Sequence, residues 1–393
     1  MPSGMVPAWG IFYLGQAFPN MKNPIPHIDL WPGNRPVIEG FLRDVRGLCR
    51  QGAFSGGPYV ARFEDEFAAY LGVKHCIGVN SGTSALHLAL LALGIGPGDE
   101  VIVPAYTFAG TVWGIIYCGA TPVFADVDAA TGNISPAAVA NAVSRRTRAV
   151  IAVHLFGQAA DLAGIRRAIR VKGGKRIRLI EDAAQAHGGR HVTGPLGTLA
   201  DIGCFSFYPT KNLGAAGEGG AVVTANAGWA KRIRLLRNHN AEERYVHLGT
   251  GYNYRMDGIQ GLFLSRKLKR LDAANRERAR IASAYLAAVE GGPITPLCTE
   301  VPGSAWHAFV CRVPRRAAFL KLLAEECIGH AIYYPRILPE LPAFKPFLKG
   351  AARGKAAFPN ASLLSRESVC LPLYPGLKST AVRRICKVLR DWR

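Results

Sequence analysis

The chain up to Thr224 alternates short apolar segments with helix-like segments, and this alternation constrains the fold more than any other feature. The segments that predict strands are HCIGV, EVIVPAY, TPVFADVD, RAVIAVHLF, IRLIED, DIGCFSF and GGAVVT. The segments that predict helices are SALHLALLALG, FAGTVWGIIYCG, SPAAVANAVS and DLAGIRRAIR. Strands that are apolar along their whole length are typical of a sheet covered on both faces. The pattern therefore predicts an α/β fold with a mostly parallel sheet.

The pattern changes after Met256. A long helical region, at about residues 256–289, leads into a proline-punctuated C-terminal part. We expect a large domain over residues 25–270 and a smaller α+β domain over residues 271–393. Residues 1–24 precede the first fold signals, and we expect them to form an N-terminal extension.

The composition excludes several classes of protein. Hydrophobic residues make up 49% of the chain and charged residues 19%, which argues against disorder. No apolar run is long enough to span a bilayer. The nine cysteines are scattered singly, without a CxxC pair or a nearby histidine cluster, so we expect neither a disulfide framework nor a metal site. We therefore expect a cytoplasmic protein without a membrane partner.

The net charge of +21 raises the question of nucleic-acid binding. The basic residues, however, are interleaved with aliphatic ones in helical stretches such as GIRRAIRVKGGKRIR and KRIRLLRN. No helix-turn-helix, zinc-finger or RNA-recognition signature accompanies them. Solvated basic helix faces are the favoured interpretation, and a phosphorylated small-molecule substrate would also benefit from this field.

Three segments carry chemistry-bearing residues. In NSGTSALHLALLALG, the Ser81-Gly82-Thr83 sequence precedes a helix, and backbone N–H groups at a helix start suit a phosphate, although ordinary N-capping explains the segment equally well. In LIEDAAQAHGG, an acid ends a strand at the sheet edge where α/β proteins bind ligands, or else caps the next helix. In GCFSFYPTKNLGAAGEGGAVVT, Lys211 follows a strand and a turn among glycines, a placement that suits an amine nucleophile.

Together these segments identify a resemblance. The chain resembles the DegT/DnrJ/EryC1/StrS family of sugar aminotransferases, which are pyridoxal 5′-phosphate (PLP) enzymes of fold-type I, the aspartate aminotransferase-like fold. The resemblance runs from about residue 25 to residue 377 and is strongest in six blocks, which are SGTSALHLALLALGIGPGDEVIVPAYTF, GATPVFADVD, VHLFGQ, IEDAAQAHGG, GCFSFYPTKNLGAAGEGGAVVT and GYNYRMDGIQ.

The resemblance implies catalytic and ring-binding roles for four residues. Lys211 is the lysine that holds PLP as a Schiff base and then moves the proton during transfer. Asp182 is the carboxylate that keeps the pyridine nitrogen protonated. Phe108 stacks on the ring, and Gln185 lies near its 3′-oxygen.

The resemblance also implies a phosphate site and a dimer. The Gly82 and Thr83 amides and the Ser206 hydroxyl hold the phosphate. Asn253 reaches the phosphate of the neighbouring subunit, which implies a homodimer with shared active sites. His154 and His187 lie close to these motifs in sequence, but packing explains them as well as catalysis does.

The resemblance implies transfer of an amino group from an amino acid, most often glutamate, to a keto sugar on a nucleoside diphosphate. The substrate-side motif of the family, HYPxPxHxQPAF, is replaced here by YYPRILPELPAF, with Tyr333 and Pro339 at the histidine positions and Leu341 at the glutamine position. In CLPLYPGL, Tyr374 stands where histidine is common. The acceptor's aminated carbon (3 or 4) and the donor (glutamate or glutamine) stay open, as does a non-nucleotide cyclic ketone such as an inosose. A PLP-binding regulator is the alternative from another class.

Overall fold

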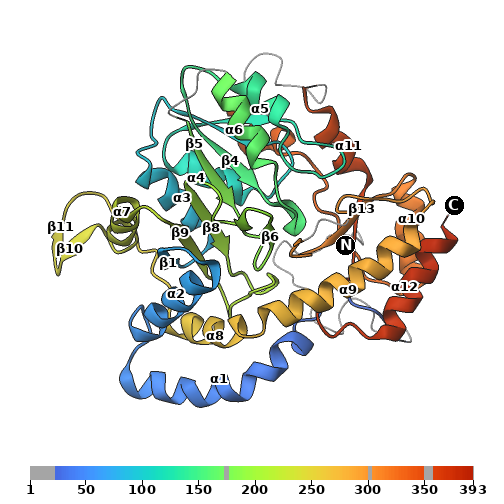
Figure 1. The fold of residues 1–393 in the computed structure, drawn as a ribbon, viewed down its shortest axis with the longest axis horizontal. Coiled ribbons are helices and arrows are strands. Elements are labelled where there is room, and N and C mark those ends of the chain that lie inside the picture. The colour runs from blue at the N-terminus through green and yellow to red at the C-terminus, as the bar shows by residue number, and fades with distance from the viewer. Residues whose placement is uncertain (1–22, 172–176, 300–302, 349–356, 393) are drawn as a thin grey trace, which may run out of the picture.

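The computed structural model describes residues 23–171, 177–299, 303–348 and 357–392 (Figure 1). Most of the predicted N-terminal extension, residues 1–22, lies outside the described residues. No helix in the described ranges has both the length and the apolar character needed to cross a membrane.

The centre of the molecule is a seven-stranded sheet with the order β1-β9-β8-β5-β4-β2-β3. Its strands are the seven predicted ones: β1 (His75–Val79), β2 (Glu100–Pro104), β3 (Thr121–Ala125), β4 (Thr147–Val153), β5 (Arg178–Asp182), β8 (Ile202–Ser206) and β9 (Gly220–Thr224). Strand β9 runs antiparallel to both of its neighbours, whereas β8, β5, β4, β2 and β3 pair in parallel. The mostly parallel sheet of the predicted fold is thereby confirmed.

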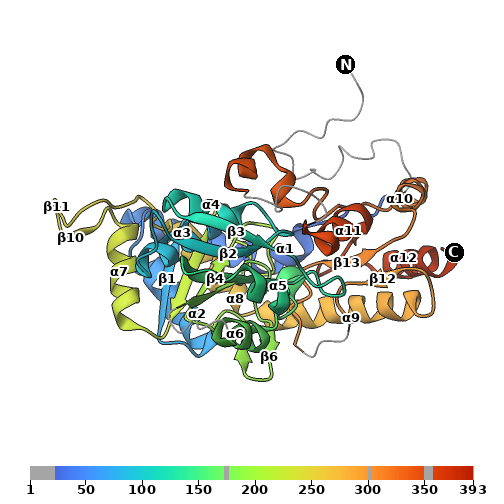
Figure 2. The ribbon, with the colours of Figure 1, turned by 90° about the horizontal axis from the view of Figure 1, so that it is seen from above.

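Helices cover both faces of this sheet (Figure 2). Alternate residues of one strand face opposite sides: Val101 and Val103 belong to one core cluster, while Ile102 lies in another. The first cluster includes α3 (Gly82–Ala92), α4 (Gly110–Tyr117) and α7 (Ala227–Arg237). On the other face pack α2 (Pro58–Leu71), α5 (Pro136–Ala142), α6 (Leu162–Val171) and α8 (Gly258–Leu268). Burial on both faces explains why the strands are apolar along their whole length.

Local signals in the sequence set several helix ends. Ser135 caps α5, where its hydroxyl accepts the Ala138 N–H at 3.4 Å and Pro136 is the first helical residue. The long helical region predicted at residues 256–289 is two helices, α8 and α9 (Leu271–Val289), which are separated at Lys269 and Arg270.

The C-terminal part forms a small antiparallel sheet of β12 (Thr295–Pro296), β13 (Phe309–Arg312) and β14 (Ser368–Leu371). It packs with α9, α10 (Arg316–Glu325) and α12 (Ser379–Asp391) in one cluster, which also contains Ile25. The segment with η2 (Leu338–Glu340), η3 (Pro342–Phe347) and α11 (Pro359–Glu367) packs instead against the core of the large sheet. The division into domains at residue 270 stays a prediction.

The remaining elements are a helix, a short 3₁₀ helix and two hairpins. Helix α1 (Trp31–Gln51) packs along α8, and η1 (Leu155–Gly157) follows β4. The hairpin β6 (Arg190–His191)–β7 (Gly194–Pro195) follows β5 in the chain. A second hairpin, β10 (Ala241–Glu243)–β11 (Val246–His247), projects from the body of the molecule (Figure 1).

Candidate active site

The candidate site lies where β5 and β8 end beside the first residues of α3 and α4. Asp182 is the last residue of β5 and Ser206 the last residue of β8, and these two strands are paired neighbours in the sheet. Because parallel strands share one carboxyl edge, residues that are far apart in sequence meet there.

Asp182 is held in one orientation inside the protein. The residue is 4% exposed. Its Oδ2 accepts the Thr111 hydroxyl at 2.8 Å, and its Oδ1 accepts the Ala184 N–H at 3.1 Å. Burial raises the pKa of Asp182, while the Thr111 and Ala184 hydrogen bonds and the charge of Lys211 act in the opposite direction.

The charge of Lys211 interacts with this carboxylate. Lys211 lies in the turn between β8 and β9, and its N–H donates to the Tyr208 carbonyl at 2.8 Å. Burial lowers the pKa of Lys211 to about 8, opposed by the charge of Asp182. A lysine in this state has a substantial fraction of neutral amine near neutral pH, which an amine nucleophile requires.

The start of α3 forms a close-packed cradle with the end of β8. A Cβ atom added at Gly82 would lie 2.6 Å from the Cβ of Ser206 and 3.2 Å from its hydroxyl. The Ser81 hydroxyl accepts the Ser84 N–H at 3.0 Å, which confirms Ser81 as the N-cap of α3. Only glycine fits at position 82, so backbone N–H groups at this helix start lie beside a serine hydroxyl, an arrangement that suits a phosphate.

An aromatic wall stands next to the cradle. A Cβ at Gly110 would lie 2.9 Å from the Phe108 ring and 3.1 Å from the Thr83 hydroxyl, so these two residues border one space. The Phe108 ring is 62% exposed and lies 6.4 Å from the Tyr334 ring. Phe108 therefore has a ring face available to a ligand.

Gln185 has a fixed amide orientation. Its Oε1 accepts the Phe156 N–H at 2.6 Å, and its Nε2 donates to the Tyr334 hydroxyl at 3.2 Å. The residue is 7% exposed. Through these two hydrogen bonds it connects η1, at Phe156, with the segment at Tyr334.

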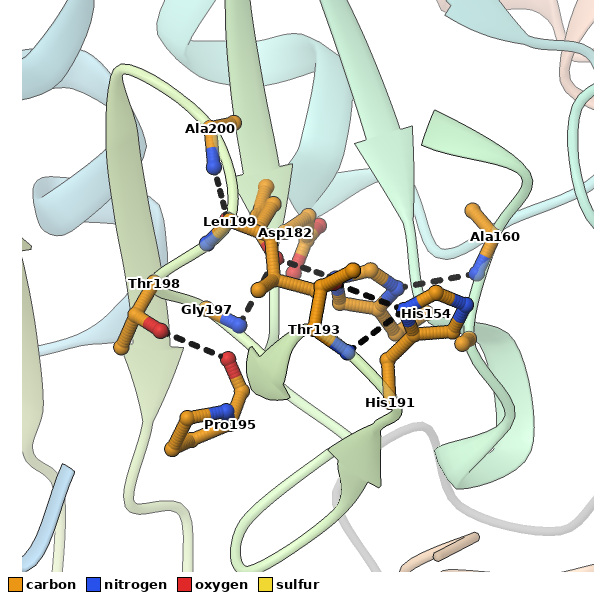
Figure 3. A network of polar contacts seen from close by, with 12 residues as sticks. His154, Ala160, Asp182, His191, Thr193, Pro195, Gly197, Thr198, Leu199 and Ala200 are labelled. Carbon is orange, nitrogen blue, oxygen red and sulfur yellow. Dashed lines mark hydrogen bonds and ion pairs between the residues drawn. The ribbon is translucent and has the colours of Figure 1, made fainter. Parts of the chain in front are cut away.

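A buried network of hydrogen bonds holds the end of β5 in place (Figure 3). The Glu181 carboxylate is fully buried. It accepts the Gly197 N–H at 2.8 Å, the Leu199 and Ala200 N–H groups at 2.7 Å each, and the His154 Nε2–H at 2.8 Å. Four donors on one carboxylate satisfy its desolvated charge.

The two histidines near the motifs do different things. The Nδ1 atom of His154 accepts the Ala160 N–H at 3.0 Å, which leaves the proton on Nε2 for Glu181. His187 packs its ring against Phe205 and Phe207. Burial, and then the charge of Lys211, lowers the pKa of His187 to about 3, so its ring is neutral at neutral pH.

Asn253 lies beside Asn80, the residue that precedes the Ser81 N-cap of α3. Asn253 is exposed, and its backbone carbonyl accepts the Asn80 side-chain N–H at 3.4 Å. The neighbouring hairpin β10–β11 carries Tyr245 at 80% exposure. Both features lie on the outside of the single chain.

The sequence motifs did not point to two residues of the site. Thr111 donates to Asp182 from the first turn of α4, and Tyr334 touches Gln185, Phe108 and Tyr106. The sequence signal for Tyr334 was its position directly after Tyr333, in the segment that differs from the family's substrate-side motif. The signal for Thr111 was its place three residues after Phe108.

Comparisons with known proteins agree with this geometry. The model of the DegT/DnrJ/EryC1/StrS aminotransferase family matches residues 37–390. The chain belongs to this family.

Curated relatives match the chain over nearly its whole length. A dTDP-3-amino-3,4,6-trideoxy-alpha-D-glucose transaminase of Streptomyces venezuelae is 38% identical, with 94% of this chain and 96% of the relative covered. A UDP-N-acetyl-3-dehydro-alpha-D-glucosamine 3-aminotransferase of Acidithiobacillus ferrooxidans is 39% identical, with 93% and 99% covered. A Geobacillus stearothermophilus protein named pleiotropic regulatory protein is 37% identical, with 94% and 98% covered.

Solved structures give the same result. The crystal structure of S. venezuelae DesV in complex with a ketimine intermediate superposes with a TM-score of 0.89 at 35% identity, covering 94% of this chain and 99% of that one. The PLP form of a putative sugar aminotransferase from Streptococcus pneumoniae has a TM-score of 0.83 at 26% identity, covering 94% and 98%. This family member is a PLP-dependent aminotransferase of fold-type I, as the resemblance implied.

The residues present fit PLP chemically. An amine with a pKa of about 8 interacts through its charge with a buried carboxylate. A helix start that admits only glycine at position 82 offers N–H groups and a hydroxyl to a phosphate. An exposed aromatic ring offers a face for stacking.

Proposed function

We propose that this aminotransferase transfers an amino group from an amino acid to a 3- or 4-keto-deoxysugar carried on a nucleoside diphosphate. L-Glutamate is the expected donor. The observation that carries the proposal is a buried lysine, Lys211, whose charge interacts with the buried Asp182 carboxylate at the carboxyl edge of the sheet. The sugar nucleotides named for the relatives from S. venezuelae and A. ferrooxidans support the acceptor class. The net charge of +21 favours a substrate with a diphosphate.

We assign the cofactor roles as follows. PLP, when bound, supplies an electron-accepting ring that lets the amino group leave the donor and join the ketone. Lys211 holds the cofactor covalently and moves a proton at its Nζ atom. Asp182 would accept a hydrogen bond from the ring nitrogen, and the Thr111 hydroxyl keeps that carboxylate in position.

The other predicted residues position the cofactor in this proposal. The Gly82 and Thr83 amides and the Ser206 hydroxyl bind its phosphate. Phe108 would stack on its ring, and Gln185, whose amide Phe156 and Tyr334 orient, would hold the ring's 3′-oxygen.

We also propose a homodimer with shared sites, in which Asn253 serves the phosphate of the neighbouring subunit. The exposure of Asn253 in the single chain supports this role. We expect the enzyme to act in the cytoplasm on small molecules, with no nucleic-acid or membrane partner.

A two-stage experiment tests the reaction. The PLP-loaded protein is first incubated with L-glutamate or L-glutamine, and conversion of bound PLP to pyridoxamine phosphate is followed by absorbance. The aminated protein is then offered 3-keto and 4-keto nucleotide sugars beside free inososes, and the product is identified by mass spectrometry. We expect conversion by glutamate and amination of a nucleotide sugar. No conversion by either donor would exclude the transaminase.

The second candidate function is amination of a cyclic ketone that carries no nucleotide, and one observation favours it. Tyr333, at a family histidine position, packs its ring 6.0 Å from His27, and Tyr334 follows with its hydroxyl bonded to Gln185. Amination of an inosose with no turnover of any nucleotide sugar would favour this candidate. A regulatory role, suggested by the name of the Geobacillus relative, predicts PLP binding without turnover in either stage.

A further inference from the structure

A cationic pocket lies beside the Lys211 turn. It is bordered by the start of α1, the Lys211 turn, the α8–α9 junction and the segment at Tyr374. Its lining contains one carboxylate, that of Asp29, and four basic side chains, which are Lys211, Lys267, Arg270 and Arg278. The lining includes Lys211 but none of the cradle residues Gly82, Thr83 and Ser206, so the pocket adjoins the cofactor lysine without being part of the phosphate cradle.

Arg278 is the buried base of this pocket. It is 5% exposed, and its Nη1 donates to the carbonyls of Leu373 at 2.7 Å and His307 at 3.3 Å. Its Nε has no hydrogen-bond partner within the described part of the chain. Burial lowers the pKa of Arg278 to about 10, so it is charged at neutral pH. A buried charged donor without an acceptor is costly and favours an anion beside it.

Lys267 adds a second charge without a counter-ion. Its ammonium lies 5.5 Å from the centre of the Phe263 ring. Burial and the charge of Arg278 lower the pKa of Lys267 to about 8. Among the ion pairs of residues 23–171, 177–299, 303–348 and 357–392, none includes Lys267 or Arg278.

The single carboxylate of the pocket does not neutralise it. Asp29 Oδ1 accepts the Trp31 N–H at 3.0 Å at the start of α1. Like charges that share a partly desolvated space repel one another, and an entering anion relieves this repulsion. The pocket is therefore built to receive a negative group close to the Lys211 turn.

We propose that this pocket is the subsite for a carboxylate of the amino-acid donor, with Lys267 and Arg278 as its binding residues. The proposal rests on the proposed transaminase function. A carboxylate fits because it is small enough for a space whose floor is the buried Arg278, and planar like the guanidinium that it would meet. A nucleotide diphosphate is bulkier and carries a nucleoside that has to extend outwards. Exposed Arg270 at the rim suits the approach of an anion from solvent.

Two variants and a matched control test the subsite. Lys267→Met removes the charge, Lys267→Arg restores it, and Lys269→Met removes an equal charge from an exposed residue of the same segment. The first measurement is the Kd of the PLP-loaded protein for glutarate, a dicarboxylate that lacks an amine and does not react. The second is the KM for L-glutamate and for the keto sugar.

We expect Lys267→Met to raise the glutarate Kd and the glutamate KM about tenfold or more, since a charge-assisted contact is lost. Lys267→Arg should recover most of the loss, and Lys269→Met should resemble the parent protein. An unchanged glutarate Kd in Lys267→Met, or a rise confined to the KM of the keto sugar, would overturn the proposal. Failure of the proposed function is distinct, because the parent protein itself would then show no reaction with glutamate.

Discussion

The buried Glu181 network offers a sharp test of how the site is supported. The substitution Glu181→Gln keeps the shape of the side chain but replaces one carboxylate oxygen by an NH₂ group. Each oxygen of Glu181 now accepts two donors: Oε1 those of Leu199 and Ala200, and Oε2 those of Gly197 and His154. Whichever oxygen is replaced, two buried donors lose their acceptor.

The cost follows from those two donors. A buried group left without its partner costs about 1–3 kcal/mol, so we expect Glu181→Gln to lower the free energy of unfolding by about 2–6 kcal/mol. A change of tautomer at His154 does not relieve the loss, because its Nδ1 already accepts the Ala160 N–H.

The assay is urea unfolding of the protein without PLP at neutral pH, followed by circular dichroism. Glu242→Gln, a change of the same chemistry at an exposed position, is the control and should stay within about 0.5 kcal/mol of the parent. A loss below about 1 kcal/mol in Glu181→Gln would refute the argument, since a single unsatisfied donor already costs that much.

Four further outcomes are expected. The rate at which the apo-protein captures PLP should rise with pH and reach half its maximum near pH 8, because the pKa of Lys211 is lowered to about 8 and the neutral amine is the reactive form. Stopped-flow absorbance measures this rate, and a midpoint above pH 10 would contradict the expectation. Asp182→Asn should retain PLP but lower kcat with glutamate about 10²-fold or more, as measured in steady state, and near-parental kcat would remove the assigned role. Gly82→Ala should weaken PLP affinity, because the new Cβ meets Ser206 at 2.6 Å, and an unchanged Kd in a fluorescence titration would argue against the cradle. Mixing Lys211→Ala subunits with Asn253→Ala subunits should restore activity above that of either variant, and no recovery in the mixed dimers would exclude sharing of Asn253.

Much of the fold could be predicted from local patterns. All seven strands appeared in the sequence as apolar runs between helical segments, because a doubly covered sheet has no polar face. The direction of β9 could not be predicted, since composition does not record which way a strand runs. The break between α8 and α9 was missed because the helical pattern continues through Lys269 and Arg270.

The candidate site, like the fold, could be predicted in part from the sequence. Lys211 and Asp182 each stood in a recognisable segment, and strand-end geometry brings them together. The positions of Thr111 and Tyr334 beside known motifs were a signal, but their roles could not be predicted, because these arise from contacts across 71 and 149 positions of sequence, respectively. The cationic pocket was hidden for the same reason: Asp29, Lys267 and Arg278 come from segments that share no motif.

The central claim is that Lys211 holds the cofactor. The most direct measurement is to load the protein with PLP, reduce it with borohydride, digest it and locate the pyridoxyl group by mass spectrometry. We predict that the group is found on Lys211, that the loaded protein is yellow, and that Lys211→Ala abolishes both the colour and the label. A protein that stays colourless with PLP, or a label on another lysine, would contradict the account.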